Sequence, residues 1–454
     1  MVKKTLISSL ILALVFMAVM AAPATPAKAA AAVVAVDQAL SGAVVNVPEV
    51  TADAPGWMVI HATSEGFPVI GKTYVPAGTT SNVMVIIDVN AATAENLAML
   101  HIDAGEAGVY EFPGPDVPVK DSYDKVIAPP FKILGAWAAD QFVSAENTVT
   151  VNTVIAQNDG WIVIHASSDG FPVAGQAAIK AGVNKDVVVT VDPAIMTERV
   201  TAMIHDDLGV VGTYEFPGAD GPSRFAAGGA IVNEPFWTTE HVRTMGQLAG
   251  SDSKLWVASA LIKEDGWMAI HATSEGFPVI GIAPLKAGLN RNVEVTVETA
   301  GLTPTVLAML HTDAGEKGKY EFPGPDVPVN GADGNPIAPP MLVGAGVVVE
   351  DAPADRVTAS GMVEVRGVVA AQNGFMVIHA TSEGFPAIGA QFVQKGYNPR
   401  VWVKVDPARI TPEMLAMLHI DVGTAGVYEF PGADVPVLGA DGKPIAPPFK
   451  LIGN

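Results

Sequence analysis

One sixteen-residue segment occurs four times in this sequence and constrains its architecture more than any other feature. GWMVIHATSEGFPVIG runs from Gly56 to Gly71, and close copies cover residues 160–175, 266–281 and 374–389. The histidines inside successive copies are 104, 106 and 108 residues apart. That spacing is the length of a whole domain and is too long for one turn of a solenoid. The sequence therefore predicts four tandem domains of one design, at residues 32–135, 136–238, 239–345 and 346–454.

Composition and local patterning favour an all-β fold for each unit. The chain has 45 glycines and 35 prolines, and only 16% of its residues are charged, which is typical of apolar strands joined by many turns. In the first unit, apolar runs bounded by turn residues predict seven short strands, at 33–37, 43–50, 57–62, 69–75, 83–89, 97–102 and 131–134. Seven strands in a unit of this length favour an immunoglobulin-like β-sandwich, with a barrel as the alternative.

Residues 1–29 have the features of a secretory signal peptide. Lys3 and Lys4 precede an apolar stretch, residues 6–20, and the small-residue sequence 27–29 resembles a cleavage site. An uncleaved anchor is the alternative, because residues 5–22 are long enough to span a membrane, and it would be the only membrane contact. The chain has no cysteine and therefore no disulfide framework. We expect a protein that is secreted or held at the cell surface.

The charge of the chain excludes one class of partner. Its formal net charge is −21, and no cluster of Lys and Arg is present to bind phosphates. Nucleic acid is therefore excluded as a partner. An acidic surface favours solubility and attracts cations, but it does not define a site.

The junctions between units contain no flexible tether. Residues 129–141 read PPFKILGAWAADQ, without a Ser/Gly tract or a run of charges. We therefore expect the units to abut and to form a stiff array.

A set of short motifs resembles a domain of unknown function found, singly or in tandem, in secreted and cell-surface proteins of archaea and bacteria. In the first unit the motifs are Asp37-Gln38, Ile60-His61, Gly71 and the segment 98–103, which reads AMLHID. The resemblance extends over nearly the whole chain after residue 29. It implies a β-sandwich fold and an extracellular location, and it implies no activity or catalytic residue.

Eight of the nine histidines form four pairs in which the partners are 40 residues apart, and an aspartate follows each second histidine by two residues. The third and sixth strands of an immunoglobulin-like sheet are usually neighbours, so we expect the paired histidines to face each other. Residues i and i+2 of a strand share a face, so the aspartate would join them. The candidate metal ligands are His61, His101 and Asp103; His165, His205 and Asp207; His271, His311 and Asp313; and His379, His419 and Asp421.

Two readings of these triads stay open. Two imidazoles and a carboxylate, completed by water, suit zinc, iron or another divalent metal. The structural reading, which we favour, is that each histidine is buried and hydrogen-bonds its neighbours. Trp57, Val59 and His61 share one face, and the aromatic residue is expected to carry that face into the core.

Three further features are weaker candidates. Glu111 and Asp116, in YEFPGPD, could join Asp103 as oxygen ligands for calcium, but aspartates beside proline-rich turns more often cap their own backbone. Ser64 follows a histidine but lacks the strained elbow of a serine hydrolase, so we read its segment as a turn. His241 lies outside the pattern and is expected on the surface.

These observations predict a secreted or cell-surface structural or binding protein built as a stiff array of four β-sandwich repeats. Its expected partners are other cell-envelope components, or an extracellular protein or glycan. The alternative is an extracellular divalent-metal-binding protein with one His/His/Asp site per repeat. We expect no enzymatic activity and no cofactor other than that metal.

Overall fold

The structure is a computed structural model that describes residues 30–40, 42–225, 231 and 233–453. The predicted signal peptide lies outside the described residues. Strands dominate the fold of these residues, and the longest helix among them is the seven-residue α1. No helix in the described ranges has the length and apolar character needed to cross a bilayer. The all-β prediction is confirmed.

Repeat 1 contains the seven predicted strands and one additional short strand. Its strands are β1 (Ala32–Val34), β2 (Gln38–Ala39), β3 (Val44–Ala52), β4 (Gly56–Ala62), β5 (Val69–Val75), β6 (Gly78–Ile86), β7 (Glu95–Ile102) and β8 (Pro130–Trp137). β6 begins five residues before residue 83, where the prediction placed its start. The prediction missed these residues because they are mostly polar and carry no apolar signal.

The other repeats follow the same order. Repeat 2 has β9 (Thr148–Ala156), β10 (Gly160–Ala166), β11 (Val173–Ile179), β12 (Gly182–Thr190), β13 (Arg199–Asp206) and β14 (Asn233–Trp237). Repeat 3 has β15 (His241–Arg243), β16 (Lys254–Ile262), β17 (Gly266–Ala272), β18 (Val279–Leu285), β19 (Gly288–Thr296), β20 (Thr305–Thr312) and β21 (Pro340–Leu342). Repeat 4 has β22 (Gly346–Val348), β23 (Ala352–Pro353), α1 (Ala354–Ser360), β24 (Met362–Ala370), β25 (Gly374–Ala380), β26 (Ala387–Val393), β27 (Gly396–Lys404), β28 (Glu413–Ile420) and β29 (Pro448–Ile452).

Each repeat is a two-layer sandwich. In repeat 1, the sheet β1-β3-β6 packs on the sheet that contains β5, β4, β7 and β8. Alternate residues of each strand point inward, among them Val47 on β3 and Met58 and Ile60 on β4, and form the core. Each of the other repeats has a core of its own.

Repeats 1 and 2 are joined by one strand and not by a linker. β8 pairs with β7 at Phe131 and with β9 at Ala136, so the same strand belongs to both sandwiches. Phe131 and Ile133 lie in the core of repeat 1, whereas Leu134 and Ala136 lie in the core of repeat 2. The absence of slack at this junction agrees with the expectation of abutting units.

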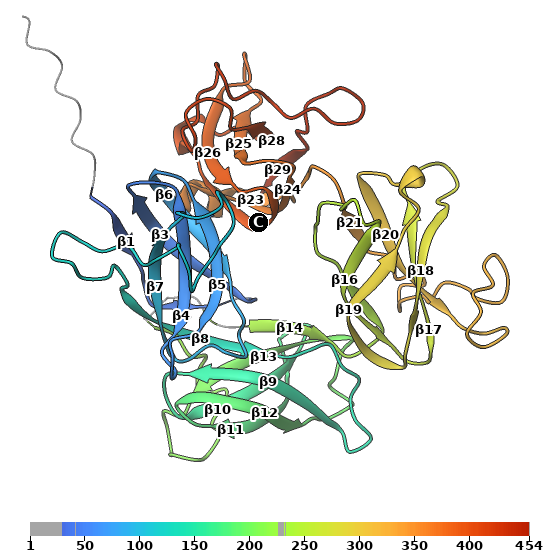
Figure 1. Ribbon diagram of the computed structural model, residues 1–454. Helices are drawn as coiled ribbons and strands as arrows, with labels where there is room; N and C mark the ends of the chain where they lie inside the picture. Colours follow the sequence, from blue (N-terminus) through green and yellow to red (C-terminus); the bar gives the residue numbers. More distant parts are fainter. Residues whose placement is uncertain (1–29, 41, 226–230, 232, 454) are drawn as a thin grey trace, which may run out of the picture.

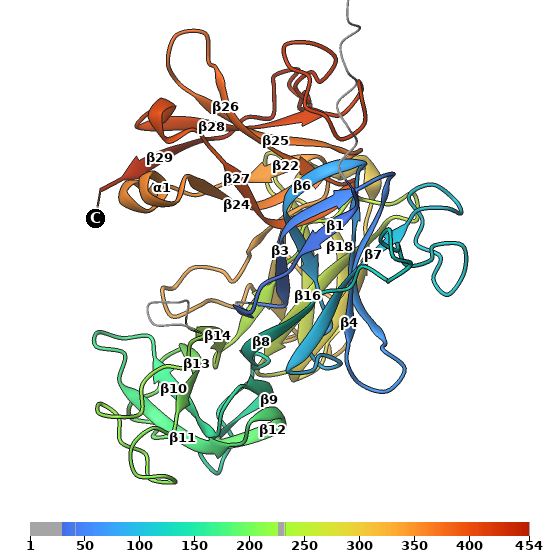
Figure 2. The same cartoon turned by 90° about the vertical axis from the view of Figure 1, so that its left-hand side faces the viewer.

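The four repeats curve back on themselves (Figures 1 and 2). Repeat 4 lies beside repeat 1, and the Gln391 side-chain amide donates a hydrogen bond of 3.0 Å to the Ser81 carbonyl. Repeat 3 also approaches repeat 4, because Gly246 lies close to the Tyr397 ring. The array is therefore closed on itself, a shape that the expectation of a stiff array did not include. Consecutive repeats meet at an angle, and the three junctions together bring the last repeat to the first (Figure 1).

Candidate functional site

The two histidines of each repeat lie on the outer face of one sheet. β4 and β7 are antiparallel neighbours, with Trp57 opposite His101 and His61 opposite Leu97. The predicted pairing of the third and sixth strands is therefore confirmed. The prediction that this face points into the sandwich core is wrong, because Met58 and the other alternate residues of β4 occupy that core. The histidine face is buried by a different part of the chain.

The imidazoles of each pair lean toward each other along the sheet. Their Nε2 atoms are 3.4 Å apart in all four repeats. His61 is 2% exposed and His101 is fully buried. Because His101 lies beside Trp57 and not beside His61, the two rings meet above the intervening pair, Val59 and Met99.

A loop after β7 covers the histidine pair. Residues 103–119 fold back over the sheet, and the Phe112 ring stands perpendicular to His101 with their centroids 4.9 Å apart. Phe112 also lies against His61, and Tyr110 packs on both Trp57 and His101. The same aromatic cover occurs in the other three repeats. Each repeat thus has a small second core outside its sandwich.

Carboxylates hold this loop in place by accepting backbone N–H groups. The two oxygens of the buried Asp116 accept from Ala104 (2.9 Å) and Glu111 (2.8 Å). Burial acts to raise the pKa of Asp116, but its backbone hydrogen bonds outweigh burial and hold that pKa below its usual value. The interpretation of YEFPGPD as a self-capped turn is confirmed.

Backbone carbonyls fix the tautomer of both histidines. The Nδ1 atom of His61 lies 2.7 Å from the carbonyl oxygen of Phe67, and Nδ1 of His101 lies 2.9 Å from that of Asp116. A carbonyl oxygen only accepts, so both Nδ1 atoms carry hydrogen. In the neutral state each Nε2 atom therefore presents a lone pair to the other.

Burial disfavours protonation of the second histidine of each pair. It lowers the pKa of His205 from 6.5 to about 4, and the nearby His165 acts in the same direction. The pKa values of His101, His311 and His419 are lowered for the same reasons. The second histidine is therefore neutral at physiological pH.

The aspartate of each predicted triad does not join the histidines. The His101 ring leans toward His61, whereas Asp103 follows His101 by two residues at the end of the strand that is farther from His61. Asp103 instead accepts a 2.9 Å hydrogen bond from the backbone N–H of Gly108. Asp207, Asp313 and Asp421 accept the equivalent bonds in their own loops. Across the described ranges, no three His, Asp or Glu side chains converge as a metal site.

The turn after β4 holds an uncommon backbone conformation beside the first histidine. Phe67 has a φ of 46°, and its equivalents in the other repeats have φ values of 45–46°. This left-handed conformation is unfavourable for a bulky residue. It aims the Phe67 carbonyl at His61, while the Phe67 ring is 55% exposed. Ser64 lies in the same turn, as predicted.

His241 differs from its prediction as a surface residue. It is half-buried, and its ring stacks on Trp237 with the centroids 4.1 Å apart. Burial lowers its pKa to about 4. The neighbouring Arg243 makes a bidentate ion pair with the buried Asp140, which links repeats 2 and 3.

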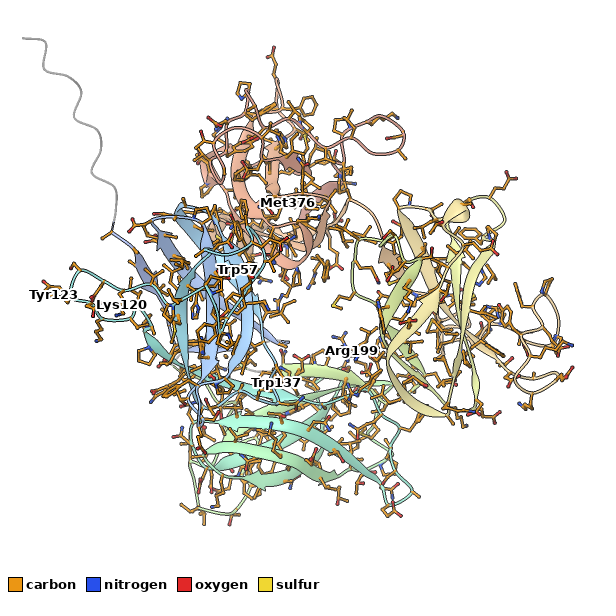
Figure 3. All side chains as sticks on the ribbon, viewed as in Figure 1. Trp57, Lys120, Tyr123, Trp137, Arg199 and Met376 are labelled. Carbon is orange, nitrogen blue, oxygen red and sulfur yellow. The ribbon has the colours of Figure 1, made fainter. Side chains whose placement is uncertain are left out.

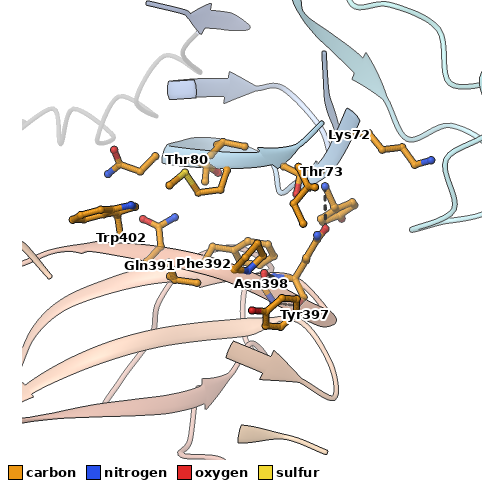
Figure 4. Close-up of a pocket in the computed structure, with 16 residues that line it drawn as sticks. Lys72, Thr73, Thr80, Gln391, Phe392, Tyr397, Asn398 and Trp402 are labelled. Atoms are coloured by element: carbon orange, nitrogen blue, oxygen red, sulfur yellow. Dashed lines mark hydrogen bonds between the residues drawn. The ribbon is translucent and has the colours of Figure 1, made fainter. Parts of the chain in front are cut away.

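A pocket lies where repeat 4 packs against repeat 1 (Figure 4). Tyr74 of repeat 1 and Phe392 of repeat 4 are in contact there, with ring centroids 6.4 Å apart. The Tyr74 N–H donates a hydrogen bond to the Gln394 side chain. Tyr74 and Phe392 occupy equivalent positions, whereas repeats 2 and 3 have Ala178 and Pro284 there. Repeats 1 and 4 are thus the two repeats with an aromatic residue at this position.

The fold and the repeated loop-covered site define a protein of four tandem immunoglobulin-like β-sandwich domains. A family model described as "Domain of unknown function (DUF7282)" matches residues 31–130, 137–237, 241–343 and 350–450. The chain belongs to this family.

Comparison with solved structures finds likeness to parts of two bacterial macroglobulins. The native conformation of E. coli alpha-2-macroglobulin is 8% identical, with a TM-score of 0.16 and coverage of 94% of this chain and 29% of that one. A variant of Salmonella alpha-2-macroglobulin is 8% identical, with a TM-score of 0.17 and coverage of 92% and 29%. The chain thus spans less than a third of either protein. No curated protein matches the chain.

Proposed function

We propose that this chain is an exported structural and binding protein of the cell envelope or cell surface, and that it is not an enzyme. The observation that carries this proposal is the direct packing of the repeats, through the shared strand β8 and the return contact of repeat 4 on repeat 1. An array without linkers holds its surface loops in fixed relative positions, which suits a scaffold that binds several copies of a partner.

The features of residues 1–29 support export. The partner that we propose is another envelope component, or an extracellular protein or glycan. Each repeat presents an exposed Phe67-type ring and a long loop to such a partner, and the loop residues Lys120 and Tyr123 project away from the other repeats (Figure 3). Divalent-metal binding by His/His/Asp triads is less well supported, because the aspartates cap their own loops.

Cell fractionation combined with mass spectrometry of the N-terminus tests the proposal. In the organism that encodes the chain, we expect a mature N-terminus between residues 22 and 30 and recovery with the envelope or the medium. The purified mature chain should bind isolated envelopes saturably. Recovery of the chain from the cytoplasm with its N-terminus at Met1 would contradict the proposal.

A further inference from the structure

We propose that in each repeat the two histidines and the methionine between them form a binding site for monovalent copper, giving four sites in the chain. This inference goes beyond the proposed structural role and does not depend on it. The ligands are His61, Met99 and His101; His165, Met203 and His205; His271, Met309 and His311; and His379, Met417 and His419.

The first argument is the pair of opposed lone pairs. Because Phe67 and Asp116 accept from the Nδ1 atoms, the Nε2 atoms of His61 and His101 have no hydrogen to share when both rings are neutral. Two buried acceptors 3.4 Å apart leave each other unsatisfied. A cation between them would use both lone pairs.

The Nδ1 contacts are those expected of metal-binding histidines. A histidine that coordinates through one nitrogen usually donates its other N–H to a carbonyl or carboxylate, which orients the ring. Both histidines of each pair have such a partner here. The left-handed conformation of Phe67 is retained in every repeat and places one of these carbonyls.

Methionine is the residue that the sheet places between the two rings. Met99 lies two residues before His101 on the same face and pairs with Val59, the residue between Trp57 and His61. The equivalent methionines pair in the same register in the other repeats. In repeat 3 the Sδ atom of Met309 is 3.2 Å from Nε2 of His311.

The separation of the nitrogens fits one shared ion. Two imidazole nitrogens that each lie about 2.0–2.1 Å from one metal, at tetrahedral to trigonal angles, are about 3.3–3.6 Å apart. The observed separation of 3.4 Å falls within that interval in all four repeats.

The chemistry of these ligands favours a soft, monovalent ion. A thioether with two imidazoles suits Cu(I), whereas hard divalent ions prefer carboxylate and water oxygens. All three ligands are neutral, and the histidines are buried, so a divalent charge would be more costly to hold there. The aspartate that could balance such a charge is turned away.

Titration of the mature four-repeat chain with Cu(I), against a chromophoric Cu(I) chelator and without oxygen, tests the site. We expect four ions per chain and a sulfur neighbour in the copper X-ray absorption spectrum. Because the chain has no cysteine, that sulfur can come only from methionine. Binding of Zn(II), measured in the same way, should not change when the four methionines are replaced.

Two sets of variants identify the ligands. Met99→Leu, Met203→Leu, Met309→Leu and Met417→Leu together should remove the sulfur neighbour and weaken Cu(I) binding, while the fold survives this volume-conserving change. The matched control changes Met84, Met196, Met245 and Met362 to Leu and should keep both signals. Thermal unfolding verifies that both variants are folded.

Two results would overturn the proposal. One is the absence of Cu(I) binding to the folded chain above that of a chain with His101→Gln, His205→Gln, His311→Gln and His419→Gln. The other is bound copper whose spectrum has no sulfur neighbour, or whose sulfur neighbour persists in the first set of methionine variants.

Discussion

The carbonyl oxygens of Phe67 and Asp116 orient the histidine pair. Because each pair is buried, the stability of the folded protein depends on pH. The folded protein resists protonation of His205, whose pKa burial lowers to about 4, whereas the unfolded chain takes up a proton near 6.5. Stability is therefore complete above about pH 6.5 and is lost as the pH falls toward 4. For His205 the loss is on the order of 3 kcal/mol.

Calorimetry at pH 7 and pH 5 measures this loss in the metal-free chain. We predict a lower unfolding temperature at pH 5, with His101, His311 and His419 contributing in the same direction. Protonation of the Asp116 carboxylate also reduces the stability of the fold, but only at lower pH, because its pKa is below the usual value. Equal unfolding temperatures at pH 7 and pH 5 would show that the buried histidines are not held neutral.

Asp116 has a different role, which a substitution isolates. Asp116→Asn removes one of its two charged acceptors for the loop backbone, so we expect a loss of about 1–3 kcal/mol and faster proteolysis within residues 103–119. Limited proteolysis and urea unfolding measure both effects. The control Glu65→Gln, in an exposed turn, should change neither. A loop as resistant as the native one would remove Asp116 from its assigned role.

At the scale of elements, the glycine that begins β4 leaves no room for a side chain against β7, and the same is true of its equivalents. In repeat 2, a Cβ atom on Gly160 would lie 2.1 Å from the carbonyl oxygen of His205. Gly160→Ala should therefore separate β10 from β13 and cost about 1–3 kcal/mol. Gly221→Ala, in the same repeat and with open space around it, is the control. Equal unfolding midpoints for the two variants would contradict this account.

The strands and the pairing of the histidines could be predicted, because alternation and spacing determine them directly. The error with Asp103 has a physical cause: spacing of i and i+2 fixes the face of a residue but not the direction in which its neighbour leans. Met99 was missed because a methionine in an apolar strand resembles core packing. The packing of Tyr110 and Phe112 over the histidines could not be predicted, because no periodic pattern shows where a proline-rich loop folds back.

At the scale of the whole molecule, the contact between repeats 1 and 4 depends on two aromatic side chains. We predict that Tyr74→Ala with Phe392→Ala opens the array and increases the radius of gyration measured by small-angle X-ray scattering, because the ring contact is lost. Tyr123→Ala, at a side chain that is 89% exposed, should leave the scattering unchanged. Unchanged scattering from the double variant would mean that this contact does not hold the repeats together.

The sequence did not reveal this closure, because two isolated aromatic residues on outer strands give no signal of contact across 318 residues. The composition of the junctions predicted stiffness but not shape, and β8 joins the first two repeats by pairing in both sandwiches. Closure brings the acidic loop that contains Gly426 against Pro76 of repeat 1.

Cross-linking between introduced cysteines tests the closed array most directly, and the absence of native cysteine leaves no background. Ser81→Cys with Gln391→Cys places one thiol on each side of the contact between repeats 1 and 4. A short bismaleimide should then join residues 81 and 391 within one chain in high yield, and should not join the control pair Ser81→Cys with Tyr123→Cys. Single adducts alone, or links only between different chains, would contradict the closed arrangement.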